Sequence, residues 1–178
     1  PPLVDALKGI PFLSGRHQRL LRLLTLPLKT IADQIQLKEP LILKLALPDS
    51  IPCAVINFDN RFLDWVAIQT EVPIDLDSSA LFPLGRAGGI AALNSGMVDL
   101  EEKSLQQVVV GGVDSFVDLG LLASLDKEKR INGPGIMDGF IPGEAASFFA
   151  IQSSDLSPRN GVAESSGSPL GKIIIHSP

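Results

Sequence analysis

Two short segments decide the fold class, namely VVVGGVDS at residues 108–115 and MDGFIPGEAASFFAIQ at residues 137–152. The run of valines is β-branched and predicts a buried strand. Gly111 and Gly112 follow it directly, and glycine lets the backbone turn sharply or lets another chain approach closely. The second segment ends in AASFFAIQ, which predicts another strand, at residues 145–152.

Outward from this pair, strand patterns alternate with helix patterns, and this predicts an α/β domain whose sheet is mixed, mostly parallel and flanked by helices. Pro27 lies inside the first helix pattern and predicts a kink or two helices. Gly96 is expected to close the third, whose other glycines suggest very close packing. Helices are expected at residues 16–37, 59–67, 84–95 and 116–125, strands at 41–47, 53–58, 71–76, 104–110 and 170–176, and loops at 130–139 and 153–169.

Composition excludes several classes of protein. The 178 residues are 45% hydrophobic and 20% charged, which is typical of a globular chain, and the formal charge of −5 argues against a nucleic-acid binder. No apolar run is long enough for a membrane span, and no signal peptide is visible. The single cysteine, Cys53, excludes a disulfide framework and any zinc site built on cysteines, and it fits a cytoplasmic location. We expect no cofactor and no metal.

Three pieces in order give the chain a resemblance to the N-terminal half of β-ketoacyl synthases, which are members of the thiolase-like superfamily. They are VPIDLDSSALFPLGRAGGIAALNSG (residues 72–96), VVVGGVDS and MDGFIPGEAASFFAIQ. The third is similar to the family's D-G-F-x-x-G-E-G-A segment, with the departure that no third glycine stands between Glu144 and Ala145, which Ala146 follows. The matching residues of the last two pieces are Gly111, Gly112, Asp114, Asp138, Gly139, Phe140, Gly143, Glu144 and Ala145.

The resemblance implies that residues 1–169 are a partial half-domain and that residues 170–178 open a second half. It also implies that the first strand of the first half and nearly all of the second half are missing. The family's nucleophile is a cysteine at a strand-to-helix turn, where the helix dipole favours the thiolate. Counting back from Gly96 by the family's helix length gives Ser79, with Ser78 as the neighbouring register, and neither is a cysteine.

Each candidate residue also has a structural interpretation. Ser79 is either a reactive serine or a helix cap, and the cap is favoured because no histidine is near it in the sequence. Cys53 follows Pro52 and is expected to be a buried small hydrophobe. Glu144 is expected to organise the loop at the end of the sheet. Asp114 and Asp138 are assigned to turn hydrogen bonds, because no cluster of metal ligands accompanies them. The only histidines, His17 and His176, lie outside any motif of the family.

Three functions compete on these grounds. The first is a non-catalytic partner in fatty-acid or polyketide-type metabolism, similar to the chain-length partner of a ketosynthase. The second is an active acyltransferase of the 3-oxoacyl-carrier-protein synthase type with Ser79 as nucleophile, and the third is an unrelated α/β binding domain.

The expected partners come from the resemblance and from charge. The resemblance implies a homodimer, or a heterodimer with a ketosynthase, through the strand expected at residues 71–76 (EVPIDL, from Glu71 to Leu76). It also implies an acyl-thioester or an acyl carrier protein. Residues 1–30 carry five basic side chains against one acidic one, so a basic helix face between Arg16 and Lys29 could meet an acidic carrier protein. A solvated helix face is the simpler interpretation of the same charges.

Overall fold

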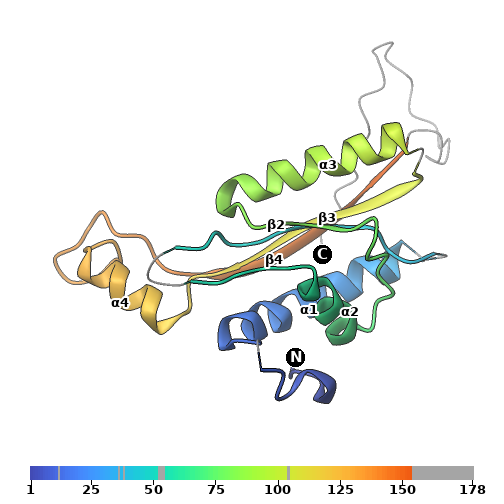
Figure 1. The fold of residues 1–178 in the computed structure, drawn as a ribbon. Coiled ribbons are helices and arrows are strands. Elements are labelled where there is room, and N and C mark those ends of the chain that lie inside the picture. The colour runs from blue at the N-terminus through green and yellow to red at the C-terminus, as the bar shows by residue number, and fades with distance from the viewer. Residues whose placement is uncertain (12, 36, 38, 52–54, 104, 154–178) are drawn as a thin grey trace, which may run out of the picture.

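A four-stranded sheet forms the middle layer of the molecule (Figure 1). The structure is a computed structural model and describes residues 1–11, 13–35, 37, 39–51, 55–103 and 105–153. The strands are β1 (Leu43–Ala46), β2 (Ala80–Phe82), β3 (Gln107–Ser115) and β4 (Glu144–Gln152), in the order β2-β1-β3-β4. β1 runs parallel to both of its neighbours and β4 runs antiparallel to β3, so the predicted mixed, mostly parallel sheet is confirmed.

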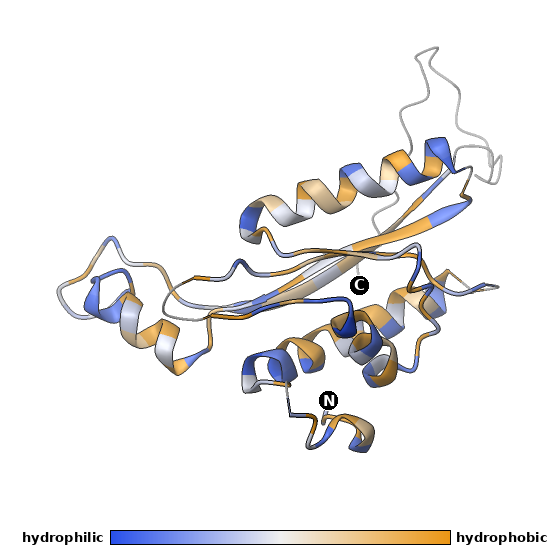
Figure 2. Cartoon of the chain, viewed as in Figure 1, coloured by the Kyte–Doolittle hydropathy of each residue, from blue (hydrophilic) through white to orange (hydrophobic). Residues whose placement is uncertain are grey.

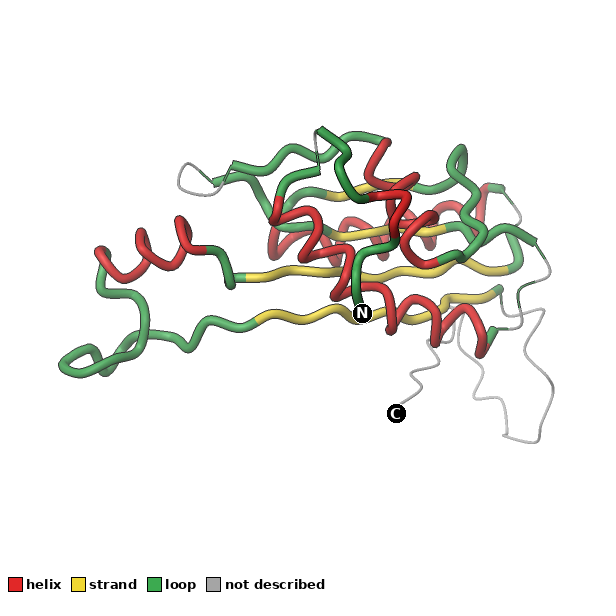
Figure 3. The backbone as a smooth tube through the Cα atoms, turned by 90° about the horizontal axis from the view of Figure 1, so that it is seen from below, coloured by secondary structure: helices red, strands yellow, loops and turns green. Residues whose placement is uncertain are grey.

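Helices cover both faces of this sheet. α3 (Gly88–Glu102) lies on one face, whereas α1 (Gly15–Gln34) and α2 (Arg61–Thr70) lie on the other, as Figure 1 shows. The turned view in Figure 3 shows the long strands β3 and β4 side by side, with α4 (Leu119–Lys127) beyond one end of the sheet. Two short 3₁₀ helices, η1 (Asp5–Leu7) and η2 (Gly85–Ala87), precede α1 and α3.

The hydrophobic core is divided by the sheet. Alternate residues of a strand face opposite sides, so Val109 packs toward α1 while Val108 and Val110 pack toward α3. Leu20, Leu24 and Leu28 recur at helical spacing in α1 and are fully buried in the larger cluster. The apolar colour in Figure 2 runs along the middle of the sheet, between the helix layers.

α1 is a single helix, so of the two alternatives expected at Pro27, a kink or two helices, the second is wrong. Ser14 caps its start, because the Ser14 side chain accepts a hydrogen bond from the backbone N–H of His17. Proline removes one backbone donor from the helix. The buried leucines before and after Pro27 belong to one apolar stripe, and packing that stripe keeps the helix continuous.

The strand before α3 is not where the sequence pattern placed it. Residues 71–76 form only an isolated bridge, between Ile74 and Leu41, because Pro73 has no N–H to offer a strand ladder. The strand is instead β2, which begins at Ala80. The strand expected at residues 53–58 is also absent from its described part, residues 55–58.

Glycines set the contact between α3 and the sheet. A Cβ on Gly88 would lie 2.8 Å from the carbonyl oxygen of Phe82, and one on Gly96 would lie 2.9 Å from Ile151 Cδ1. The close packing expected of the helix glycines is therefore present at Gly88 and absent at Gly89, where nothing lies within 4 Å of a Cβ, and Gly96 adds a close contact that was not expected. Gly96 does not end the helix as predicted, since α3 continues to Glu102.

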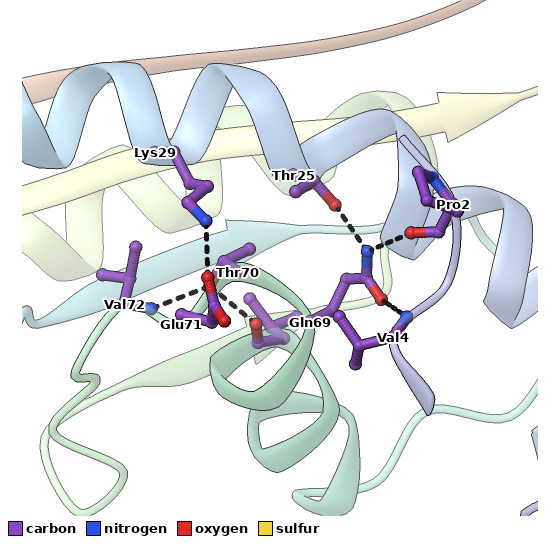
Figure 4. A network of polar contacts seen from close by, with 9 residues as sticks. Pro2, Val4, Thr25, Lys29, Gln69, Thr70, Glu71 and Val72 are labelled. Atoms are coloured by element: carbon purple, nitrogen blue, oxygen red, sulfur yellow. Dashed lines mark hydrogen bonds and ion pairs between the residues drawn. The ribbon is translucent and has the colours of Figure 1, made fainter. Parts of the chain in front are cut away.

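A polar network ties the first residues to α1 and α2 (Figure 4). Gln69 is buried, and its amide bonds the N–H of Val4, the carbonyl of Pro2 and the hydroxyl of Thr25. Lys29 pairs with Glu71 at 2.9 Å at the end of α2. Within the described ranges, no helix combines the length and the apolar character that crossing a membrane requires.

Candidate functional site

A cavity of about 900 Å³ opens at the carboxyl ends of the three parallel strands. Pro48 and Asp49 follow β1, Leu84 to Arg86 follow β2, and Asp114 to Phe116 end β3, and all of them line it. In open α/β sheets, ligands bind at this edge of the sheet. The parallel strands therefore bring the ends of three chain segments to one place.

The turn between β2 and α3 forms one side of the cavity. The N–H of Gly85 donates to the carbonyl of Leu47, and Gly85 takes a φ of 53°, which glycine adopts without strain. η2 then leads directly into α3, whose start at Ala87 has no side-chain cap. The sequence PLGRAGG of residues 83–89 contains no serine, threonine, cysteine or histidine.

Ser78 and Ser79 do not lie at this turn. Both precede β2, and the Ser79 hydroxyl accepts a hydrogen bond of 2.9 Å from the N–H of Leu43 on β1. The carbonyl of Ser78 accepts one of 2.8 Å from Lys44. The expectation that Ser79 begins a helix is therefore wrong: it joins the 75–79 turn to β1, and it caps no helix.

Glu144 is held by two partners at the far side of the cavity. Its carboxylate accepts from Arg19 at 2.5 and 2.9 Å and from the Ser115 hydroxyl at 2.9 Å. The hydrogen bonds from Arg19 hold the pKa of Glu144 below its usual value although burial acts in the opposite direction, and Ser115 adds to the lowering. A carboxylate fixed in this way is a weak base, and its contacts connect α1, β3 and β4.

The other predicted motif residues separate into two groups. Asp114, Phe140, Gly143 and Glu144 line the cavity together. Asp114 accepts a 2.7 Å hydrogen bond from the N–H of Ser115. Asp138 does not line it, and Gly139 supports a tight loop, since a Cβ there would lie 2.4 Å from the N–H nitrogen of Asn132.

Gly111 and Gly112 lie in the middle of β3 and form no turn. The ring of Phe148, on the opposed β4, occupies the space beside Gly111, where a Cβ would lie 2.1 Å from ring carbon Cδ1. A Cβ on Gly112 would meet Ala46 of β1 at 3.3 Å. These glycines thus let side chains of the neighbouring strands β4 and β1 approach the backbone of β3 closely.

Apolar side chains form the wall of the cavity that faces α4. Leu121 and Leu125 are buried, and the rings of Phe116 and Phe140 meet edge to face at 5.4 Å. Arginines stand among them, and the lining includes Arg16, Arg86 and Arg130. Within the described residues, the lining contains no cysteine or histidine, and its one hydroxyl, Ser115, is 2% exposed and bonded to Glu144.

The remaining candidates lie elsewhere. His17 is buried among Phe58, Phe62 and Trp65, with Nδ1 beside the Ser14 hydroxyl at 2.8 Å and Nε2 against the Asn57 carbonyl at 3.1 Å. Burial lowers the pKa of His17. Cys53, His176 and the strand expected at residues 170–176 lie outside the described residues. The described residues contain no group of three or more His, Cys, Asp or Glu side chains arranged for a metal.

Sequence reasoning missed Leu84 and Arg86 as site residues, and it missed the pairing of Arg19 with Glu144. Leu84 and Arg86 carried a usable signal, because Pro-Leu-Gly is a turn sequence directly after the apolar run Ala80–Phe82. Arg19 carried none, since its partner Glu144 is 125 residues away in the chain.

Comparison with known proteins identifies the fold. No family model matches the sequence, and no curated protein matches it at a significant level. The structure is similar to the ketosynthase from module 6 of the bacillaene synthase of Bacillus subtilis, in a cysteine-to-serine mutant form, with a TM-score of 0.51 and 12% identity over 80% of this chain and 26% of that one. A second structure of that ketosynthase gives a TM-score of 0.45 and 14% identity over 80% and 27%. The chain thus spans about a quarter of the ketosynthase it matches, and the likeness confirms the predicted thiolase-like α/β fold.

Proposed function

We propose that this chain is a β-ketoacyl-synthase-like protein of fatty-acid or polyketide-type metabolism that is non-catalytic in this form and acts as a chain-length-factor-like partner. One observation carries the proposal. The turn between β2 and α3 is the place where a ketosynthase-like fold would present its nucleophile, and here it reads PLGRAGG. A side chain without a thiol or hydroxyl at that turn cannot form an acyl-enzyme.

The hydroxyls nearby support the same proposal. Ser79 lies before β2, and its hydroxyl oxygen accepts a hydrogen bond from the β1 backbone at Leu43, which gives it a structural role. Ser115 is buried and donates to Glu144, whose lowered pKa makes it a poor base. An unactivated serine hydroxyl is a weak nucleophile.

Acylation by a thioester tests this proposal directly. The chain is incubated with an acyl-coenzyme A, and its intact mass is measured beside that of the Ser79→Ala variant. We expect no added mass in either protein. An adduct that disappears in Ser79→Ala would establish the active acyltransferase instead, and an adduct retained in that variant would place the nucleophile elsewhere, for example at Cys53.

The proposed organisation follows from the same resemblance. Residues 1–169 would be a partial first half-domain, and residues 170–178 would begin the second half. A ketosynthase-like dimer would use residues 71–76, which precede β2 in the chain and include Leu76 at 44% exposure.

Sedimentation velocity tests the dimer. We expect Leu76→Glu to shift the protein toward the monomer, because a charge at the interface would be left without a partner. Leu26→Glu, on α1 at 67% exposure, is the matched control and should sediment like the parent. Monomeric parent protein would contradict the homodimer, and binding to an added ketosynthase would then test the heterodimer.

Docking of an acidic carrier protein is proposed for the basic face of α1. Arg16, Arg19 and Arg22 line a second cavity of about 650 Å³ on that side of the molecule. Charge reversal at Arg22 should weaken binding of an acyl carrier protein and reduce its dependence on salt. An unchanged affinity would reject this surface.

A further inference from the structure

Arg86 brings a positive charge to the cavity at the carboxyl ends of the parallel strands. It is exposed and lies in η2, directly before α3. Within the described part of the chain it makes no ion pair, whereas Arg130, in the same lining, lies 3.8 Å from Glu128. The planar guanidinium binds a carboxylate through two parallel hydrogen bonds.

The acidic side chains of the lining do not all compete for Arg86. Glu144 is neutralised by Arg19, and Asp114 is already bonded to the N–H of Ser115. Asp49 is in direct contact with the turn, since its Cβ lies 3.2 Å from the position of a Cβ placed on Gly85. Arg86 and Asp49 are therefore the charged side chains of the lining that lie on or against the turn.

The opposite wall is apolar and partly open to solvent. Phe116 and Phe140 pack against Leu121 there, and Ile141, which also lines the cavity, is 81% exposed. Pockets that combine a large apolar surface with a few polar groups take small ligands with an apolar body and one oriented polar end.

We propose that this cavity binds an aliphatic carboxylate without a covalent bond, with the carboxylate on Arg86 and the aliphatic chain along the wall formed by Phe116, Phe140, Leu121 and Ile141. The choice of an aliphatic body rests on the proposed function, in which the molecule serves acyl-chain metabolism. In this assignment, the turn that would carry a nucleophile holds an ionic anchor instead.

Calorimetric titration of the full chain with decanoate tests the proposal. We expect saturable binding to one site, weakened about tenfold by Arg86→Gln, because one charge-assisted hydrogen-bonded pair is lost. Decanol lacks the carboxylate, and its affinity should be the same for the parent and Arg86→Gln. Asp49→Asn removes the neighbouring negative charge and should strengthen decanoate binding.

Two further variants separate this cavity from the rest of the surface. Ile141→Asn removes apolar wall at an exposed position and should weaken decanoate and decanol alike. Arg22 lines the second cavity, so Arg22→Gln should change neither the affinity for decanoate nor the affinity for decanol. Circular dichroism and thermal melting of every variant verify that the fold is retained.

Each contrary result overturns the proposal in a specific way. Absence of decanoate binding, or equal affinity of the parent and Arg86→Gln, would reject it. Weakening by Arg22→Gln alone would place the ligand in the other cavity and also reject it. An acyl adduct in the mass measurement would reject the non-catalytic function without changing the result of this titration, so the two failures can be distinguished.

Discussion

Only glycine fits at position 111, because the ring of Phe148 occupies the space where a side chain would lie. The two residues are opposed in the β3–β4 pair, and even a methyl group on Gly111 would lie within 2.1 Å of the ring. The glycine at this position of VVVGG thus has a local physical cause, namely an aromatic side chain of the neighbouring strand that lies over it.

His17 gives the molecule a dependence on pH that can be measured. Its pKa is lowered by burial, so below an ordinary histidine pKa of about 6.5 the unfolded chain takes up a proton that the folded chain resists. This stabilisation is complete above that pH and is lost as the pH falls through the lowered value. We expect the free energy of unfolding in urea to decrease between about pH 7 and pH 5, with a slope of at most about 1.4 kcal/mol per pH unit.

The variant His17→Gln should lose this slope, while His176→Gln should keep it. An unchanged slope in His17→Gln would assign the dependence to other groups. The carboxylates with lowered pKa values, such as Glu144 and Asp99, ionise in a more acidic range and do not obscure this window.

Lys44 and Asp99 form a buried ion pair between β1 and α3. Their charged groups lie 2.5 Å apart, with side chains 4% and 8% exposed, and Lys103 joins Asp99 at 2.9 Å. Burial would raise the pKa of Asp99, but the hydrogen bonds from Lys44 and Lys103 lower it. Asp99→Asn leaves the buried ammonium of Lys44 without its counter-ion and should destabilise the fold by about 3 kcal/mol.

Chemical denaturation measures this loss, and the double variant Lys44→Met with Asp99→Leu is the informative comparison. It removes both charges and should recover most of the lost stability. If the double variant is as unstable as Asp99→Asn, the stability is lost with the ion pair itself and not through the unpaired ammonium of Lys44.

At the scale of elements, α3 contains a matched pair of glycines in its first turn. Gly88→Ala would bring a methyl group 2.8 Å from the Phe82 carbonyl oxygen and should destabilise the fold by about 2 kcal/mol, because the backbone of β2 must shift. Gly89→Ala meets nothing within 4 Å and should stabilise it by up to about 1 kcal/mol. Thermal melting of both variants checks the opposite signs, and equal effects would contradict the close packing of α3 on the sheet.

The elements that the sequence predicted well have strong local patterns. The valine run and AASFFAIQ became β3 and β4, and LILKLAL became β1. β2 was placed wrongly because its three residues carry almost no pattern. Their position is set by the pairing of the two strands, in which Lys44 of β1 lies opposite Ala80 of β2. The candidate site depends on the same long-range pairing. Counting along the family pattern therefore selected Ser79, whereas the turn in the structure contains Arg86.

At the scale of the whole molecule, residues 116–143 form an arm beyond the sheet that includes α4 (Figure 1). The arm has its own small cluster, in which Leu121 and Leu125 are the buried members, separate from the two clusters that pack on the sheet. A segment with so small a core opens locally at a lower free energy than the strands do.

Hydrogen exchange tests this division of the molecule. Leu121→Ala should remove most of the amide protection within the arm and leave β1 and β3 protected, because the cavity it creates lies in the small cluster alone. Leu24→Ala, in the core between α1 and the sheet, should instead lower protection throughout by about 2–5 kcal/mol. A loss of protection in β3 after Leu121→Ala would contradict separate opening. If the arm does open by itself, added decanoate should slow its exchange in the parent protein, since Phe116, Phe140 and Ile141 belong both to the arm and to the proposed ligand wall.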